Sequence, residues 1–409
     1  MPFIGNQPAK VPLTSADITD GIIVNADISS TAGITLNKIS GNPNFRNIVI
    51  NGDMQVAQRS TSVASITTAG YYTLDRFYIQ NTTLGTFTMS QSTDVPSGYG
   101  FATSLKMDCT TADASPSASD ALTIQQSFEG QNLQYLKKGT ANAVSLTASF
   151  WVKSTKTGTF ICELLDTDNS RHTNKSYTIN TTNTWEFKTV TFSADTTGAL
   201  NNDNGESLRL VFWLGAGTNF TSGTLATTWG STTTANRAVG QVNIADSTSN
   251  DFLITGVQLE AGTSATDFEF LPIDVNLGRC QRYYYKLLPG AADKAFGIGL
   301  AYNTNVLSMP IDFSTTMRTA PSALEQSGTA SHYKCLRAGA SDPCTSVPAF
   351  VNATVYGSVV DFNVTGTLTI GTGVQGWSNN SAAYLAWSAE LWFIKYLKQM
   401  NMVQLSMQE

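Results

Sequence analysis

Runs of alternating apolar and polar residues recur along the middle of this chain, with turn-forming residues between them. The alternation is clearest from Val144 to Val152, where every second residue is apolar and therefore lies on one face of a strand. Strands of this length and spacing indicate one large antiparallel sandwich over residues 43–273. The strands are predicted at 45–50, 74–80, 86–90, 104–108, 122–126, 145–153, 159–165, 175–179, 185–192, 207–214 and 251–260.

Residues 274–290 contain the best helix candidate in the first three-quarters of the chain. Asp274 is a suitable N-cap, and apolar residues recur at helical spacing from Leu277 to Leu287. Pro289 and Gly290 end the pattern. We predict a hinge helix at a domain border.

The strand pattern returns in residues 291–390 and predicts a second, smaller β domain. Its strands are expected at 296–302, 306–313, 349–355, 358–364, 367–370 and 383–390. The last residues, 391–409, are good helix formers without Gly or Pro, so a terminal helix is favoured. Continuation of the last strand to about Tyr396 is the alternative.

The leader, residues 1–42, shows a different pattern. Its isoleucines recur at a step of five or six, which is neither a helical nor a strand period. A single such thread cannot bury them, so we predict that several copies of the chain wind about a common axis; a tail resting on a neighbour is the alternative. The isoleucines expected at this contact between copies are Ile18, Ile23, Ile28, Ile34 and Ile39.

Composition narrows the class of protein. Charged residues make up only 13%, about half the average of roughly 25% for globular domains, and Thr, Ser, Asn and 32 Gly take their place. Aromatic residues reach 10%. These values exclude a coiled coil, an ordinary helical enzyme and a charged disordered chain. An all-β surface protein with uncharged polar faces remains.

The net charge is −6, and no basic cluster is longer than Lys137-Lys138, which argues against binding to nucleic acid. No apolar run reaches about 18 residues, so no membrane-spanning helix is expected. The N-terminal residues also lack the features of a secretory signal. An extracellular type of surface without export signals fits a virus particle, assembled in the host cytoplasm and then released.

Residues for catalysis are scarce. The two histidines, His172 and His332, lie beside no nucleophile, so no catalytic triad is indicated. The five cysteines are scattered, and free thiols are favoured even for Cys335 and Cys344, which could meet across a loop. We predict no metal site, no cofactor and no enzymatic activity. Glycan depolymerisation, which needs two facing carboxylates, is the enzymatic alternative.

Two tryptophans in polar loops are candidates for glycan binding, because a ring can stack on a sugar while polar neighbours bind its hydroxyls. Trp377 is the stronger, with Asn379 and Asn380 beside it, and Trp229 is the second. For both, a loop anchor or a trimer contact is the alternative. Three other tryptophans lie within strand patterns and are predicted to belong to the core: Trp151, Trp185 and Trp213.

Asp75 and Arg76 are adjacent within a predicted strand and would point to opposite faces. We expect Arg76 to pair with a carboxylate on its own face, either Glu260 or Asp53. A salt bridge at the rim of the sheet is favoured over recognition of a ligand.

Several strings resemble a known family. NPNFRNIVINGDMQVAQRSTS, YYTLDRFYI, FWVKSTKTGTF, ITGVQLEAGTSATDFEFLPI and GRCQRYYYKL are similar to the central module of bacteriophage tail-fibre and related virion appendage proteins. The leader IGNQPAKVPLTSADITDGIIVNADIS resembles their virion-attachment segment, so the resemblance covers about residues 1–290. Residues 317–321 and 384–391 are similar to strands of the small terminal domain of such fibres, whereas the tail after Leu391 departs from the pattern.

This resemblance implies a carbohydrate-binding-module-like jelly roll and a homotrimer. It also implies that residues 1–42 attach to other virion proteins of the tail, neck or capsid. The domain at 291–390 would then contact a polysaccharide or receptor on the host surface. A head fibre or a neck or capsid decoration built from the same modules is the alternative to a tail fibre.

Overall fold

The computed structural model describes residues 45–366 and 368–391. The leader isoleucines Ile18, Ile23, Ile28, Ile34 and Ile39 and the predicted terminal helix lie outside these residues. Two compact units divide the chain at Phe45 and Arg46, and all described residues after Phe45 belong to the second. They form antiparallel sheets with little helix, which confirms the all-β class. No helix among them is long and apolar enough to cross a membrane.

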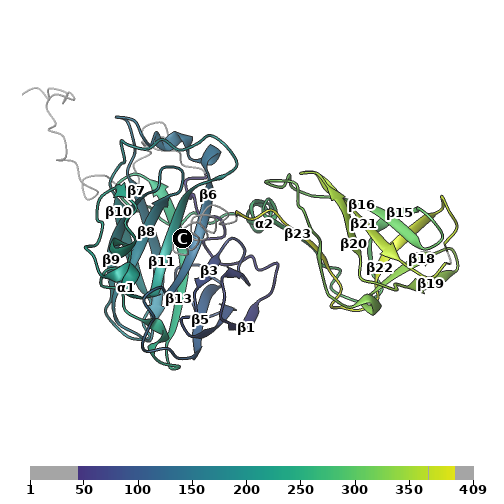
Figure 1. Ribbon diagram of the computed structural model, residues 1–409, viewed down its shortest axis with the longest axis horizontal. Helices are drawn as coiled ribbons and strands as arrows, with labels where there is room; N and C mark the ends of the chain where they lie inside the picture. The colour runs from purple at the N-terminus through teal and green to yellow at the C-terminus, as the bar shows by residue number, and fades with distance from the viewer. Residues whose placement is uncertain (1–44, 367, 392–409) are drawn as a thin grey trace, which may run out of the picture. The chain divides into compact units, whose positions relative to one another are not determined.

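The first part of this unit is a jelly-roll-type sandwich of two antiparallel sheets (Figure 1). The six-stranded sheet has the order β1 (Ser62–Ile66), β4 (Thr86–Ser92), β5 (Ser104–Thr111), β13 (Asp251–Ala261), β7 (Leu146–Ser154) and β10 (Glu186–Phe192). The seven-stranded sandwich sheet has the order β12 (Gly230–Ser231), β9 (Arg171–Ile179), β8 (Gly158–Asp166), β11 (Glu206–Ala216), β6 (Ala121–Glu129), β3 (Tyr78–Asn81) and β2 (Gly70–Tyr71).

The core of the sandwich lies between these two sheets, because alternate residues of each strand point inward. Phe150 on β7 meets Phe212 on β11 with their ring centroids 4.9 Å apart. Phe252 on β13 meets Phe160 on β8 at 5.6 Å. The opposite residues of each strand therefore face away from this core.

The outer face of the seven-stranded sandwich sheet is also buried. Segment 217–243, which includes α1 (Thr218–Thr221), contributes Ala238, Phe220 and Leu225 to an apolar cluster around Trp213 on β11. Arg237 of this segment forms a buried ion pair with Glu163 on β8, at 2.8 Å and 2.9 Å. Burial alone would raise the pKa of Glu163, but the charge of Arg237 together with the hydrogen bonds from His172 and Arg237 outweighs this effect and lowers the pKa to about 2.

The second part is the smaller β domain that the sequence predicts (Figure 1). Its seven-stranded sheet, here called the C-terminal sheet, has the order β19 (Ala340–Pro343), β18 (Tyr333–Arg337), β22 (Gly373–Ser378), β15 (Ala295–Ala301), β16 (Val306–Asp312), β21 (Gly357–Asn363) and β20 (Ala349–Ala353). A three-stranded sheet has the order β14 (Tyr284–Leu287), β23 (Leu385–Ser388) and β17 (Glu325–Gln326). One apolar cluster, with Trp387 in its interior, joins the two sheets.

Helix α2 (Ile273–Gln281) confirms only the first half of the predicted hinge helix. The second half is strand β14, because Tyr284 and Leu287 pair with β23. Asp274 lies in the first turn and Pro272 is the N-cap, so the predicted cap was wrong. The helix is tied to the sandwich just beyond its end, where Arg282 binds both oxygens of Glu129 at 2.7 Å.

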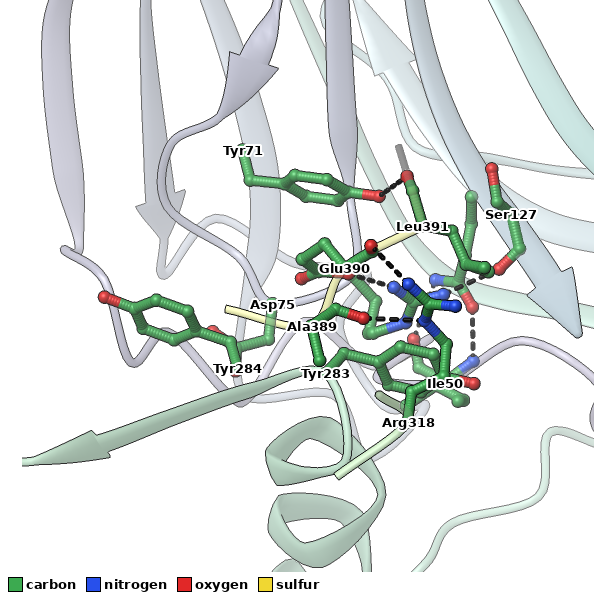
Figure 2. A network of polar contacts seen from close by, with 12 residues as sticks. Ile50, Tyr71, Asp75, Ser127, Tyr283, Tyr284, Arg318, Ala389, Glu390 and Leu391 are labelled. Carbon is green, nitrogen blue, oxygen red and sulfur yellow. Dashed lines mark hydrogen bonds and ion pairs between the residues drawn. The ribbon is translucent and has the colours of Figure 1, made fainter. Parts of the chain in front are cut away.

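The end of β23 returns to the sandwich at a buried network of polar contacts (Figure 2). Arg76 forms an ion pair with Glu390 and donates to the carbonyl of Ser127 at 2.6 Å. Its guanidinium lies 3.5 Å from the ring centroid of Tyr283. Arg318 donates to the carbonyls of Ala389 and Glu390 at 2.7 Å and 2.9 Å. The partners predicted for Arg76, Glu260 or Asp53, were therefore wrong.

Some predicted strands are wrong. Residues 45–50 and 368–370 form no strand, and residue 367 lies outside the described part of the chain. Residues 74–77 form a turn in which Arg76 has a φ of 72°. Asn51 begins a turn that is closed by a hydrogen bond from the Met54 N–H to the Asn51 carbonyl at 3.0 Å. A Cβ on Gly52 would lie 2.1 Å from the carbonyl oxygen of Val257, so this close approach requires glycine.

Candidate functional site

The outer face of the six-stranded sheet carries an aromatic side chain on β7, the strand next to the edge strand β10. On β7, Phe150 points into the core, so its neighbour Trp151 points outward. Trp151 is opposite Phe187 on β10 and Thr255 on β13. Trp151 and Trp185 are only partly buried, so their predicted place in the core was wrong, whereas Trp213 is buried as predicted.

Two exposed rings flank Trp151. The ring centroid of Tyr99 lies 4.2 Å from that of Trp151, and the centroid of Phe187 lies 5.3 Å away on the other strand. Tyr99 is 55% exposed and Phe187 is 48% exposed. A large area of aromatic surface is therefore open to solvent in one place.

A second aromatic cluster faces the first. Phe101, Phe268 and Phe270 contact one another with centroid distances of 4.8–5.2 Å. Phe101 lies directly over Gly256 of β13, whose φ is +60° and whose added Cβ would lie 2.6 Å from the ring. Glycine at position 256 therefore permits both the left-handed backbone and the close approach of the ring.

Between the two clusters lies a groove of about 470 Å³. This volume falls within the range of about 300–1,000 Å³ that is typical of ligand sites. Ser149, Thr266 and Asp267 add polar atoms to the aromatic lining. The full lining consists of Tyr99, Phe101, Ser149, Trp151, Phe187, Gly256, Ala265, Thr266, Asp267, Phe268 and Phe270.

Buried polar groups hold the wall of the groove at residues 262–271. The carboxylate of Glu260 accepts from the backbone N–H and the hydroxyl of Thr266, each at 2.8 Å. Gln258 donates to Glu260 at 2.9 Å, and its own carbonyl accepts from the backbone of Glu269 at 2.9 Å. Arg46 donates to the Thr266 hydroxyl at 2.8 Å. This wall is therefore positioned before any ligand binds.

The opposite wall is fixed through Asp94, which precedes Tyr99. Its carboxylate accepts from Lys153 at 2.5 Å and from the indole of Trp185 at 2.9 Å. Desolvation works to raise the pKa of Asp94, but the hydrogen bonds from Lys153 and Trp185 outweigh it and lower the pKa. Asp94 therefore stays ionised and keeps both partners near neutral pH.

The groove combines the two features that carbohydrate recognition needs. Flat aromatic faces can stack on the apolar faces of pyranose rings, and a few polar groups can bind hydroxyls. Both walls are rigid, so little conformational entropy is lost on binding. Within residues 45–366 and 368–391, no group of three or more His, Cys, Asp or Glu side chains could hold a metal ion.

The predicted site residues lie elsewhere. Trp377 is on strand β22 rather than in a loop, and its indole donates to Gln375 at 2.7 Å. Asn379 and Asn380 use their side chains in the following turn, with Asn379 donating to the carbonyl of Ser331 at 3.0 Å and Asn380 accepting from a backbone N–H at 2.8 Å.

Trp229 has the contacts of a loop anchor. Its indole donates to the carbonyl of Ser193 at 2.8 Å, and Lys138 lies 4.7 Å from its ring centroid. The ring also packs against the sandwich core. Neither Trp229 nor the residues 377–380 line the groove. Cys335 and Cys344 are free and buried, as favoured from the sequence.

Comparisons with known proteins give fold likeness only. No family model matches the chain, and no curated protein matches it. Three solved structures are similar over 53% of this chain. They are the enzymatically active domain of tailspike protein 4 from bacteriophage CBA120 (14% identity, 21% of that chain, TM-score 0.28), a putative sugar binding protein from Bacteroides thetaiotaomicron VPI-5482 (11%, 99%, 0.30), and TmCBM61 in complex with beta-1,4-galactotriose (9%, 99%, 0.27).

The chain thus matches about a fifth of the length of the tailspike structure. At these identities and TM-scores, a function cannot be transferred from any of the three. We therefore base the functional assignment on the residues of this chain.

Proposed function

We propose that this protein is a structural component of a bacteriophage virion, a trimeric tail fibre that binds glycan on the host surface. The groove on the six-stranded sheet carries the binding function, because exposed rings and polar atoms meet there on two rigid walls. A head fibre or a neck or capsid decoration with the same groove is the alternative.

The virion role is supported by the strings in residues 1–290 that resemble phage appendage proteins. The leader with its regularly spaced isoleucines is the proposed attachment segment, and the host cytoplasm is the proposed place of synthesis. Removal of residues 1–42 should abolish retention on particles. Localisation of the protein in intact particles separates a tail fibre from a head or neck position.

Self-association is supported by the outer face of the C-terminal sheet. Ile298 and Leu300 project from β15 with 62% and 60% of their surface exposed, and Tyr302 follows at 76%. Lys334 on β18 lies to one side of this stripe, and Asp361 on β21 lies to the other. Lys334 is itself paired with Asp293, so the exposed apolar stripe is the surface that further copies of the same chain would cover.

We propose binding without cleavage. Among the lining residues within the described part of the chain, Asp267 is the one carboxylate. Glycosidases use two carboxylates separated by about 5–9.5 Å. Release of reducing ends from host polysaccharide by the intact protein would contradict this proposal.

The direct test is binding to a panel of purified host and plant polysaccharides, measured by affinity electrophoresis. Trp151→Ala should weaken binding at least about fivefold, since stacking contributes roughly 1 kcal/mol or more. Tyr99→Ala and Phe187→Ala are further groove variants, at side chains that are 55% and 48% exposed. Tyr356→Ala, an exposed ring in the second β domain, is the matched control.

Trp377→Ala separates the groove from the site predicted at 377–380. If Trp377→Ala abolishes binding to the polysaccharides and Trp151→Ala does not, the glycan site lies in the second β domain. Equal binding by all four groove and control variants would overturn the proposal.

A further inference from the structure

We infer that the groove selects its glycan by charge, and that Asp267 is the residue that does so: it takes neutral or amino-bearing sugars and rejects chains that carry carboxylate, phosphate or sulfate groups. This inference rests on the proposed function, because it names the class of ligand for the same groove.

The first observation is the charge of the lining. Asp267 is exposed at the rim, and none of the lining residues in the described chain is Lys or Arg. Within residues 45–366 and 368–391, the carboxylate of Asp267 has no hydrogen-bond or ion-pair partner. Its charge is therefore not balanced by a direct partner at the rim of the groove.

The second observation is that two cations beside the groove, Lys153 and Arg46, are already paired. Lys153, next to the groove floor on β7, donates to the carboxylate of Asp94 at 2.5 Å. Arg46 lies 3.8 Å from the carboxylate of Glu260, and its other contacts include the Thr266 hydroxyl. The charge of each of these two cations is therefore already balanced by a carboxylate of the protein.

The third observation is that the backbone of Asp267 is fixed. Its carbonyl oxygen accepts from Arg46 at 2.5 Å and from Gln258 at 3.3 Å. On either side, Thr266 and Glu269 are held by Glu260, Gln258 and Asn47. These bonds hold the backbone of the wall in place, so the carboxylate of Asp267 stays at the rim of the groove when a ligand binds.

The expected size of the effect follows from Coulomb's law. A ligand carboxylate about 5 Å from Asp267 in a solvated groove should bind about three- to tenfold more weakly than its neutral counterpart. Added salt screens such exposed charges over about 8–10 Å, so the difference should shrink at high ionic strength. An amino sugar should show the opposite salt dependence.

The test compares ligands that differ only in charge. β-1,4-Glucan, β-1,4-mannan and β-1,4-galactan oligosaccharides are titrated by calorimetry beside the same oligosaccharides oxidised to carboxylates at C6, together with partly deacetylated chitin oligosaccharides. Full-length protein is compared with Asp267→Asn and Asp267→Lys, and Asp312→Asn, an exposed Asp on β16, is the control. The readout is the ratio of the neutral to the carboxylated affinity at low and at high salt.

We expect the ratio to fall towards one in Asp267→Asn, to invert in Asp267→Lys, and to stay unchanged in Asp312→Asn. A merely structural role of Asp267 would weaken every ligand alike and leave the ratio unchanged, which would overturn the inference. Equal or tighter binding of the carboxylated chains by the unmodified protein would also overturn it, while the groove would remain a glycan site. If no oligosaccharide binds and Trp151→Ala changes nothing, the proposed function fails and this inference fails with it.

Discussion

The outer face of the six-stranded sheet and the outer face of the C-terminal sheet differ in the kind of apolar side chain that they expose. Both expose large apolar side chains from alternate strand positions. On the first face these are rings, and the loops at 99–101 and 262–271 rise beside them to form a groove. On the second face the centre is aliphatic, with Ile298 and Leu300 exposed on β15. Rings between polar walls fit a sugar, whereas an aliphatic stripe fits another protein surface.

The opposite face of the sandwich sharpens this contrast. There, segment 217–243 lies over the sheet and is fastened by the ion pair of Glu163 and Arg237. One outer face of the sandwich is thus covered by segment 217–243, and the other carries the groove. The outer face of the C-terminal sheet is exposed at Ile298 and Leu300.

Removing the ion pair that holds segment 217–243 on the sheet should cause the largest loss of folding stability. Arg237→Met leaves the buried carboxylate of Glu163 without its cation and should destabilise the protein by about 3–5 kcal/mol. Chemical denaturation with tryptophan fluorescence measures this change. Arg337→Met, which removes a partly exposed ion pair with Asp342, is the control and should cost about 0–1 kcal/mol. Equal losses of folding stability in both variants would contradict the role of this ion pair in holding segment 217–243 on the sheet.

Acid should weaken the same ion pair and lower the folding stability of the protein. The folded pKa of Glu163 is about 2 against an ordinary 4.5, so its contribution is complete above pH 4.5 and is lost as pH falls from 4.5 towards 2. The loss amounts to about 3 kcal/mol. The free energy of unfolding, measured by chemical denaturation at several pH values between 6 and 2.5, should depend less on pH in Glu163→Gln than in the wild-type protein. Asp312→Asn should keep the wild-type dependence on pH. A wild-type curve without a fall in this range would contradict the prediction.

Loosening the groove wall should have an intermediate effect. Glu260→Ala removes the acceptor of two hydrogen bonds from Thr266 and should destabilise the wall by about 1–3 kcal/mol. Because the wall then becomes mobile, glycan affinity should fall about tenfold, measured by calorimetry. Glu325→Ala, whose carboxylate accepts from Tyr284 outside the groove, is the control. Unchanged affinity in Glu260→Ala would show that the wall takes no part in binding.

Changing the aliphatic stripe should alter assembly with the smallest change in folding. Leu300→Lys places a charge in the exposed stripe and should weaken self-association about tenfold or more, with folding stability changed by only about 0.5 kcal/mol. Light scattering across a dilution series measures the mass. Val351→Lys, at an exposed position on β20, is the control. A monomeric wild-type protein, or an unaffected variant, would remove the stripe from the interface.

Much of the sandwich could be predicted because its strands alternate. Nearly every run with a period of two between 86 and 260 forms a strand in the structure. The same alternation already placed Trp151 opposite Phe150, so the outward ring of the groove was available from the pattern. It was missed because strand tryptophans were assigned to the core without asking which face they occupied.

The C-terminal sheet was harder to predict. Strand β22 contains Gly373 and Gly376, which suggest a loop, yet Gly376 fits closely in the strand, since an added Cβ would lie 3.1 Å from side-chain atoms of Met309 and Phe362. The partner of Arg76 was also out of reach, since Glu390 is 314 positions away. Local patterns specify strands, but pairings over such separations depend on the whole fold.

The pairing of β14 with β23 has a mechanical consequence. The chain leaves the sandwich through β14, and β23 comes back alongside it in register from Tyr284 with Ser388 to Leu287 with Leu385. Beyond β23, Ala389 is hydrogen-bonded to Tyr283, and Glu390 is clamped by Arg76. The connection therefore consists of two hydrogen-bonded antiparallel strands rather than a single strand. A stretching force along this connection would have to break several hydrogen bonds between β14 and β23 at the same time, and both strands would resist a torsional force.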